Sequence, residues 1–281
     1  MDLASEIERN VAAALAEDVG DGDATAPLTP AGKQARAAVL CRQDAVLCGQ
    51  PWFDACIRKL DPKAKIQWAA AEGTKVTAGS RVCTLQGEAR ALLAAERSAI
   101  NFLQTLSAVA TATRRLVDAA AGTRAKIVDT RKTLPGLRYA QKYAVRTGGG
   151  ANHRMGLYDA MLIKENHIAA AGSVRQVIAE AKKVARPGIW AQIEVESLDQ
   201  LKEALAAGAN MILLDNMSID QMREAVTITG DRAELEASGG ITLDNVRAIA
   251  ETGVHRISSG SLTKDVKAVD FSMRFEAEKF R

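Results

Sequence analysis

From residue 126 onward, short apolar runs alternate with segments of helical periodicity, and this rhythm constrains the fold more than any other feature of the sequence. The apolar runs are six segments: 126–130, 161–164, 192–196, 211–215, 234–239 and 256–260. Apolar residues recur at helical spacing in the segments 173–185, 198–207, 219–229 and 243–252. Strands that alternate with helices form repeated strand–helix–strand units, so the sequence predicts an α/β domain with a parallel sheet.

The predicted strands end in polar residues, as the strands around a barrel active site do. The first two are joined by a connection of roughly thirty residues, which is long for such a domain. From Arg124 to Lys164 there are nine Lys and Arg residues and one His against two acids, although the whole chain balances 37 basic residues against 34 acidic ones. The local charge predicts an anionic ligand, since Arg and Lys bind carboxylates and phosphates. The expected cations of this site are Arg131, Lys132, His153, Arg154 and Lys164.

Three further cations, Arg138, Lys142 and Arg146, are spaced four residues apart within the connection. This spacing predicts one stripe on a short helix. The stripe either faces the ligand or is a solvated surface, and the spacing leaves both interpretations open.

Carboxylates and glycines follow the later strands. Glu194 and Glu196 are two residues apart and so point to the same side of a strand, and Asp215 ends the next strand. These acids can hold Mg²⁺ that shares phosphate oxygens, stabilise a cationic centre, or merely pair with nearby cations. Two loops, 238–240 and 258–261, combine Ser with Gly as phosphate-binding barrel loops do. The combination fits phosphoribosyl diphosphate together with a small aromatic acid.

The N-terminal part has strand-like stretches at 37–48, 65–70 and 82–86, followed by one long helical tract at 88–121. The four cysteines form no Cys-x-x-Cys pair and are expected to be buried thiols, with metal or disulfide roles left open. A net charge of +3 argues against a general nucleic-acid surface. The sequence shows no signal peptide and no run of eighteen apolar residues, so we expect a cytoplasmic protein without a membrane segment.

Several longer motifs resemble those of the quinolinate phosphoribosyltransferase family, in the family's order and over most of the chain. They are 95–104 (AERSAINFLQ), 129–138 (DTRKTLPGLR), 142–154 with its triple glycine and Asn-His-Arg, 162–167 (LIKENH), 193–196 (IEVE), 214–217 (LDNM), 236–241 (EASGGI) and 260–264 (GSLTK). The chain departs from the family pattern at Gln141, Thr147, His255, Ser259 and Ser261.

The resemblance implies an N-terminal α/β sandwich domain, residues 1–110, and an open α/β barrel, residues 111–266, with the tail 267–281 packed on the sandwich. It implies a homodimer in which Arg97 reaches the partner's site, although from the residues alone Arg97 is interpreted as a solvated helix charge. It implies the reaction of quinolinate with phosphoribosyl diphosphate and Mg²⁺ to nicotinate mononucleotide, CO₂ and diphosphate, a step of NAD biosynthesis.

The resemblance also implies residue roles. Quinolinate is expected to contact Arg97, Arg131, His153, Arg154 and Lys164. Phosphoribosyl diphosphate is expected to contact Thr130, Lys132, Glu194, Asp215, Ser238, Gly239, Gly240, Ser259, Gly260 and Ser261. Lys132, Glu194 and Asp215 are the expected catalytic residues, and Glu194 and Asp215 are expected to hold Mg²⁺ directly or through water.

Three alternatives remain at the level of sequence. A nicotinate phosphoribosyltransferase would bind a monocarboxylate and release no CO₂, and the number of cations favours a dicarboxylate. A non-catalytic or transport-associated paralogue would lack an acid or a phosphate loop, and none is missing. A structural protein with a basic patch would not bind phosphoribosyl diphosphate at all.

Overall fold

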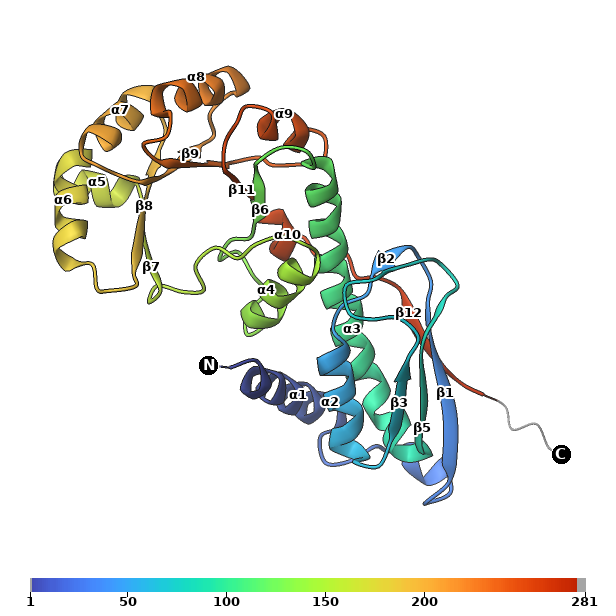
Figure 1. The fold of residues 1–281 in the computed structure, drawn as a ribbon. Helices are drawn as coiled ribbons and strands as arrows, with labels where there is room; N and C mark the ends of the chain where they lie inside the picture. Colours follow the sequence, from blue (N-terminus) through green and yellow to red (C-terminus); the bar gives the residue numbers. More distant parts are fainter. Residues whose placement is uncertain (1, 277–281) are drawn as a thin grey trace. The chain divides into compact units, whose positions relative to one another are not determined.

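A computed structural model describes residues 2–276 of the 281-residue chain (Figure 1). The described residues form two compact units: unit 1 with residues 2–112, 134–148 and 266–276, and unit 2 with residues 113–133 and 149–265. This division differs from the expected boundaries in one respect, because residues 134–148 belong to unit 1 and not to the barrel. Of the expected tail, residues 277–281 lie outside the described residues.

Unit 1 is built on an antiparallel four-stranded sheet in the order β12-β1-β5-β3. Its strands are β1 (Gln34–Cys41), β3 (Lys65–Trp68), β5 (Arg81–Glu88) and β12 (Phe271–Phe275), with a small second sheet of β2 (Ala45–Val46) and β4 (Lys75–Val76). Its helices are α1 (Leu3–Val19), η1 (Ala26–Leu28), α2 (Gln50–Leu60), α4 (Arg138–Thr147) and the larger part of α3 (Ala89–Ala119). The C-terminal strand β12 pairs with β1, which places residues 271–275 in this sheet.

Helix α4 belongs to unit 1 because its apolar face is part of that unit's core. Ala140, Ala144 and Val145 are buried in the same cluster as Trp52 and Phe53. The ring of Tyr143 also packs edge-on against Trp52, with ring centroids 5.2 Å apart.

The expected short helix of the connection is therefore confirmed, but its interpretation as a solvated stripe is wrong in part. Arg146 is exposed, whereas Lys142 is only 1% exposed. Arg138, Lys142 and Arg146 belong to unit 1, whereas the cations that follow the strands belong to unit 2.

Unit 2 contains a six-stranded, all-parallel sheet in the order β6-β11-β10-β9-β8-β7. The strands are β6 (Lys126–Val128), β7 (Ala160–Ile163), β8 (Trp190–Val195), β9 (Met211–Asp215), β10 (Glu234–Ser238) and β11 (Arg256–Ser258). The helices are α5 (Glu165–Ala171), α6 (Val174–Val184), α7 (Leu198–Ala206), α8 (Ile219–Thr229), α9 (Val246–Ala250) and α10 (Ser261–Lys264), with the end of α3. Helices α6 to α9 follow the outer face of the sheet (Figure 1). Strands β6 and β7 lie at opposite edges, so the barrel is open, and the expected α/β architecture is confirmed.

Three of these helices begin with the same N-cap pattern. Ser173, Ser197 and Ser218 are the N-caps of α6, α7 and α8, and each side chain accepts the backbone N–H of a Gln three residues later. An N-cap serine satisfies an N–H group that has no partner within the helix, and it fixes where the helix starts. The helix positions in turn fix where the preceding strands end.

The expectation of buried thiols is confirmed, because Cys41, Cys48, Cys56 and Cys83 are all buried and free. Burial raises the pKa of Cys56 and of Cys83 to about 12, so these thiols are unreactive at neutral pH. Between residues 2 and 276, no helix is both long and apolar enough to cross a bilayer.

Gly49, the N-cap of α2, is a position in unit 1 where both the backbone conformation and the packing disfavour a side chain. Its φ is +110°, and a Cβ would lie 3.3 Å from the Cα of Leu103 and the carbonyl oxygen of Phe102 on α3. We expect Gly49→Ala to lower the free energy of unfolding by about 2–5 kcal/mol, through backbone strain and crowding together. Chemical denaturation measures this change.

Gly79→Ala is the matched control, since Gly79 has a φ of +83° but a Cβ added there would have no atom within 4 Å. Strain alone should cost about 1–2 kcal/mol there. Equal losses in the two variants would show that crowding against α3 contributes nothing.

Candidate active site

The ends of the parallel strands of unit 2 enclose a cavity of about 290 Å³. It is lined by Thr130, Arg131, Lys132, His153, Arg154, Leu162, Lys164, Glu194, Leu213, Asp215, Glu236, Ser238 and Ser258. These residues come from strands β7 to β11, from the segments that follow β6 and β7, and from the segment before β7. The carboxyl end of the sheet is therefore the place where unit 2 gathers its polar groups, as the alternation of strands and helices predicts.

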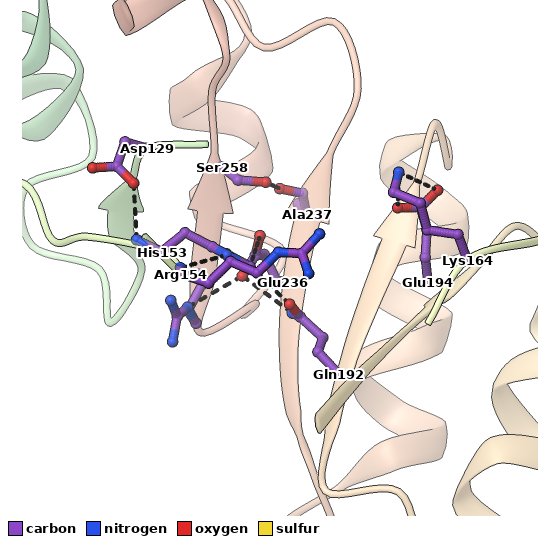
Figure 2. A network of polar contacts seen from close by, with 10 residues as sticks. Asp129, His153, Arg154, Lys164, Gln192, Glu194, Glu236, Ala237 and Ser258 are labelled. Atoms are coloured by element: carbon purple, nitrogen blue, oxygen red, sulfur yellow. Dashed lines mark hydrogen bonds and ion pairs between the residues drawn. The ribbon is translucent and has the colours of Figure 1, made fainter. Parts of the chain in front are cut away.

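A buried carboxylate positions two of the lining residues. Asp129 is fully buried after β6, and its oxygens accept the side-chain amide of Asn152 at 2.5 Å and the backbone N–H of His153 at 2.9 Å (Figure 2). Ala151 also bridges to Val128 in parallel, so residues 151–153 run along the edge of β6. Asp129 thus anchors the segment that carries His153 and Arg154.

Arg154 and Arg131 form the cationic side of the cavity. Arg154 is 8% exposed, and its Nη1 donates to the carbonyl oxygen of Ala160 at 3.3 Å. Burial lowers the pKa of Arg154, and the positive charge of Arg131 lowers it further. Two guanidinium groups that disfavour each other's charge are stabilised by an anion placed between them.

The acidic side of the cavity is made by Glu194 and Asp215. Glu194 accepts a hydrogen bond from Lys164 Nζ at 3.1 Å, in an ion pair whose lysine is half exposed (Figure 2). Asp215 accepts the side-chain amide of Asn216 at 2.9 Å. Glu196, which we expected on the same inner side as Glu194, follows the end of β8, is exposed and does not line the cavity.

Asn216 adopts a left-handed backbone conformation, with φ of +53°, which is unusual for a residue other than glycine. Its backbone N–H donates to the carbonyl oxygen of Ser238, and a Cβ at Gly239 would overlap its side-chain oxygen. Gly239 is therefore required next to Asn216. Strained residues of this kind are common at functional sites.

The two Ser-Gly loops lie beside the cavity, but only partly line it. Ser238 is a lining residue, whereas Gly239, Gly240, Ser259, Gly260 and Ser261 are not. A Cβ at Gly260 would lie 2.8 Å from the Cδ of Lys132, so the second loop contacts a lining residue. The backbone N–H of Ser259 donates to the carbonyl oxygen of Val128 in the sheet, and its hydroxyl is hydrogen-bonded to that of Ser261 at 2.7 Å.

Arg97 lies on α3 in unit 1 and is exposed. Arg97 is not one of the residues that line the cavity of unit 2, and its predicted role depends on a second copy of the chain.

Three polar residues at or next to the cavity have no role predicted from the sequence: Glu236 and Gln192, which are buried, and Arg256, which is partly buried. Glu236 is 1% exposed, and its Oε2 lies 3.2 Å from Arg256 Nε and 3.2 Å from Gln192 Nε2. Gln192 and Glu236 each precede an expected site residue, Glu194 and Ser238, by two positions. Since alternate residues of a strand point to the same face, this spacing was the signal that could have found them.

Comparison with known proteins identifies the chain. The family model of the quinolinate phosphoribosyl transferase C-terminal domain matches residues 109–274, and the model of the N-terminal domain matches residues 23–107. The chain belongs to the quinolinate phosphoribosyltransferase family.

Relatives and solved structures agree with this assignment. The chain is 40% identical over 257 residues to a probable nicotinate-nucleotide pyrophosphorylase (carboxylating) of Bacillus subtilis, covering 92% of this chain and 89% of the relative. It is 38% identical over 285 residues to quinolinate phosphoribosyltransferase (decarboxylating) 1 of Nicotiana glauca, covering 94% and 81%. The structure of the nicotinate-nucleotide pyrophosphorylase from Francisella tularensis superposes with a TM-score of 0.94 at 42% identity, covering 98% of both chains.

The two ion pairs of the site should differ in their contribution to stability. Glu236 is buried against Arg256, so Glu236→Ala should lower the free energy of unfolding by about 3–5 kcal/mol, because a buried guanidinium loses its partner. The Lys164 side chain is 48% exposed, so Lys164→Met should change stability by less than about 1 kcal/mol. Urea denaturation of both variants tests this, and a similar loss in both would contradict the described burial.

Proposed function

We propose that the protein transfers the phosphoribosyl group of 5-phosphoribosyl 1-diphosphate to quinolinate and releases CO₂, giving nicotinate mononucleotide and diphosphate. The observation that carries this proposal is the cavity of unit 2, where Arg131 and Arg154 lie side by side and Glu194 and Asp215 are present in the same lining. A dicarboxylate suits the first pair, and a ribosyl group that gains positive charge suits the second. Membership of the family supports the same reaction.

We propose that quinolinate binds through its two carboxylates to Arg131, Arg154 and Lys164. Lys164 is paired with Glu194 in the described structure, and a bound carboxylate would compete for this half-exposed ammonium group. Arg97 from a second copy of the chain would add a third arginine, in a homodimer. The exposure of Arg97 on α3 supports this arrangement.

Phosphoribosyl diphosphate would occupy the other part of the cavity. The diphosphate would lie near Thr130 and Lys132, and the 5′-phosphate near Ser238 and the glycines of both Ser-Gly loops. The contact of Gly260 with Lys132 supports this placement, because a backbone without a Cβ lets an anion approach its N–H groups closely.

Mg²⁺ fits these residues as a metal shared with the substrate. Among residues 2–276 there is no group of three or more His, Cys, Asp or Glu side chains positioned to hold a metal. Mg²⁺ commonly keeps several waters and uses one or two carboxylates together with substrate phosphates, which here would be Glu194 and Asp215. When bound, it supplies positive charge that neutralises the oxygens of the diphosphate.

The reaction follows from these charges. The lone pair of the quinolinate nitrogen forms a bond to C1′ of the ribose, and the C1′–oxygen bond breaks as diphosphate leaves with its electron pair. Glu194 and Asp215 stabilise the positive charge that develops on the ribosyl group, and Lys132 stabilises the departing diphosphate.

Decarboxylation then uses the new pyridinium as the electron sink. The bond between ring carbon 2 and its carboxylate breaks, CO₂ leaves, and the electron pair stays on carbon 2, which takes a proton from water. Contacts that held the 2-carboxylate too tightly in the ground state would raise this barrier. We therefore propose that the closest arginine contacts are made to the 3-carboxylate, which is retained.

We also propose a cytoplasmic location, which the four free thiols support, since thiols stay reduced in that compartment.

The decisive assay combines the protein with quinolinate, phosphoribosyl diphosphate and Mg²⁺. We expect CO₂ and nicotinate mononucleotide in equal amounts. Turnover of nicotinate without CO₂ release would favour a nicotinate phosphoribosyltransferase, and no turnover of either acid would favour a non-catalytic relative.

Arg131→Ala should reduce kcat/KM for quinolinate by a factor that corresponds to about 2–5 kcal/mol of lost transition-state stabilisation, mostly through a higher KM, because a partly buried cation that pairs with the ligand is lost. Steady-state kinetics measure the change. Arg223→Ala is the control, since Arg223 pairs with Asp220 on the exposed face of α8. An unchanged KM in Arg131→Ala would remove Arg131 from the quinolinate site.

The dimer proposal predicts that two defective variants restore each other. If Arg97 acts across subunits, co-expressed Arg97→Ala and Arg131→Ala chains should regain roughly a quarter of wild-type activity, because half of the dimers are mixed and one of their two sites is intact. Arg131→Ala with Glu194→Ala is the control, since both residues belong to the same cavity and no intact site can form. Mixed dimers that stay inactive would show that Arg97 does not complete the partner's site.

A further inference from the structure

Both ring nitrogens of His153 are engaged inside the protein. The ring is 6% exposed, its Nδ1 accepts the backbone N–H of Arg154 at 2.8 Å, and its Nε2 lies 2.9 Å from Gln192 Oε1 (Figure 2). A backbone N–H can only donate, so Nδ1 carries no proton. The proton of the neutral ring is therefore on Nε2, where it is donated to Gln192.

The hydrogen bond from Gln192 to Glu236 independently places the proton of the His153 ring on Nε2. Gln192 is 1% exposed, and its Nε2 donates to Glu236 Oε2, a carboxylate that can only accept. The amide oxygen of Gln192 must then face His153, where it needs a donor. The guanidinium of Arg256 on the neighbouring strand holds the charge of Glu236 in place. One arrangement of protons satisfies the hydrogen bonds that run from the ring through Gln192 to Glu236 Oε2.

This arrangement leaves the imidazole without an N–H group for a ligand. The ring lines the cavity, but neither nitrogen can bind a carboxylate of quinolinate or give a proton to the substrate while these bonds persist. The ring is also restrained by Trp190, edge-on with centroids 5.2 Å apart, and by Asp129, which holds its backbone N–H. His153 is thus held from four directions, and Nδ1 in turn holds the peptide of Arg154.

We propose that Gln192 and Glu236 are positioning residues that keep His153 in its Nε2–H form, and that His153 acts by fixing Arg154 at the cavity wall and not by contacting quinolinate. The proposal revises the direct role that the family resemblance implies for His153. It rests on the proposed function only in that Arg154 is taken to bind the substrate.

The first experiment observes the tautomer without turnover. The full-length protein is labelled with ¹⁵N-histidine, and its three histidines are assigned with His167→Gln and His255→Gln variants. Long-range ¹H–¹⁵N spectra should show His153 as a neutral Nε2–H ring, and saturating quinolinate without phosphoribosyl diphosphate should leave that pattern unchanged. An Nδ1–H ring, an imidazolium, or loss of the Nε2–H pattern on adding quinolinate would overturn the proposal.

Gln192→Met tests this series of hydrogen bonds, because it removes the oxygen that accepts from His153 Nε2 and keeps a side chain of similar volume. We expect a mixture of His153 tautomers and a KM for quinolinate raised about tenfold with a much smaller change in kcat. Thr229→Val is the control: Thr229 is buried in unit 2, its hydroxyl has no hydrogen-bond partner among the described residues, and its loss should leave KM unchanged. An unaltered tautomer and KM in Gln192→Met would contradict the proposal.

A pair of substitutions at His153 remains informative if Gln192→Met fails to fold. The amide of an asparagine can replace Nδ1 as the acceptor for Arg154, whereas the amide of a glutamine extends to the position of Nε2. We expect His153→Asn to retain more quinolinate affinity than His153→Gln, and the reverse order would indicate direct contact through Nε2. Affinity is measured by calorimetry with quinolinate alone, and this measurement does not need turnover. An inactive wild type would therefore refute the proposed reaction, while the order of the two affinities would still decide the role of His153.

Discussion

The register of the parallel sheet in unit 2 is the constraint on which the site depends. Ser238 pairs with Asp215, Val195 with Leu214, and Ser258 with Val128, so the ends of neighbouring strands lie at one level. The residues that follow each strand therefore meet at one rim, although they are far apart in sequence. A slip of one residue in any strand would turn its inward side chains to the helical side. Gln192 with Glu194, and Glu236 with Ser238, show this alternation, with the first residue of each pair buried and the second partly exposed.

The rim is arranged for its ligand at some cost to the empty protein. Burial lowers the pKa of Arg154 and the positive charge of Arg131 lowers it further, and Asn216 holds a backbone conformation that costs about 1–3 kcal/mol in other proteins. Arg131 and Arg154 line the cavity, and Asn216 directly follows the lining residue Asp215. Natural proteins commonly concentrate such destabilising features where function requires them. The fixed positive charge is then stabilised when an anion binds.

Much of this structure follows from local sequence, and the remainder from contacts that no local pattern encodes. Strand β9 and helix α8 have the predicted bounds, because apolar periodicity and serine caps act over a few residues. The placement of α4 in unit 1 depends on Trp52, which is about ninety residues away from Tyr143. The hydrogen bonds that link His153, Gln192 and Glu236 connect strands that are not adjacent. Gln192 lies on β8 and Glu236 on β10, and β9 lies between these strands. A cation-rich site could be predicted from the local charge, and strand alternation could have pointed to Gln192, but its hydrogen bonds to His153 and Glu236 could not be predicted.

The neutral amide of Gln192 also explains how a buried acid can lie beneath an anion-binding cavity. Glu236 Oε1 is 3.7 Å from His153 Nε2, close enough that a protonated ring would form an ion pair with it. Gln192 lies between these groups as a hydrogen-bonded spacer that carries no charge, and Arg256 pairs with the carboxylate from the other side. The negative charge of Glu236 is thus held by Arg256 and does not compete with a carboxylate ligand for Arg131 and Arg154. A buried charge is tolerable only when it is paired and hydrogen-bonded, and here the pairing also keeps it away from the ligand.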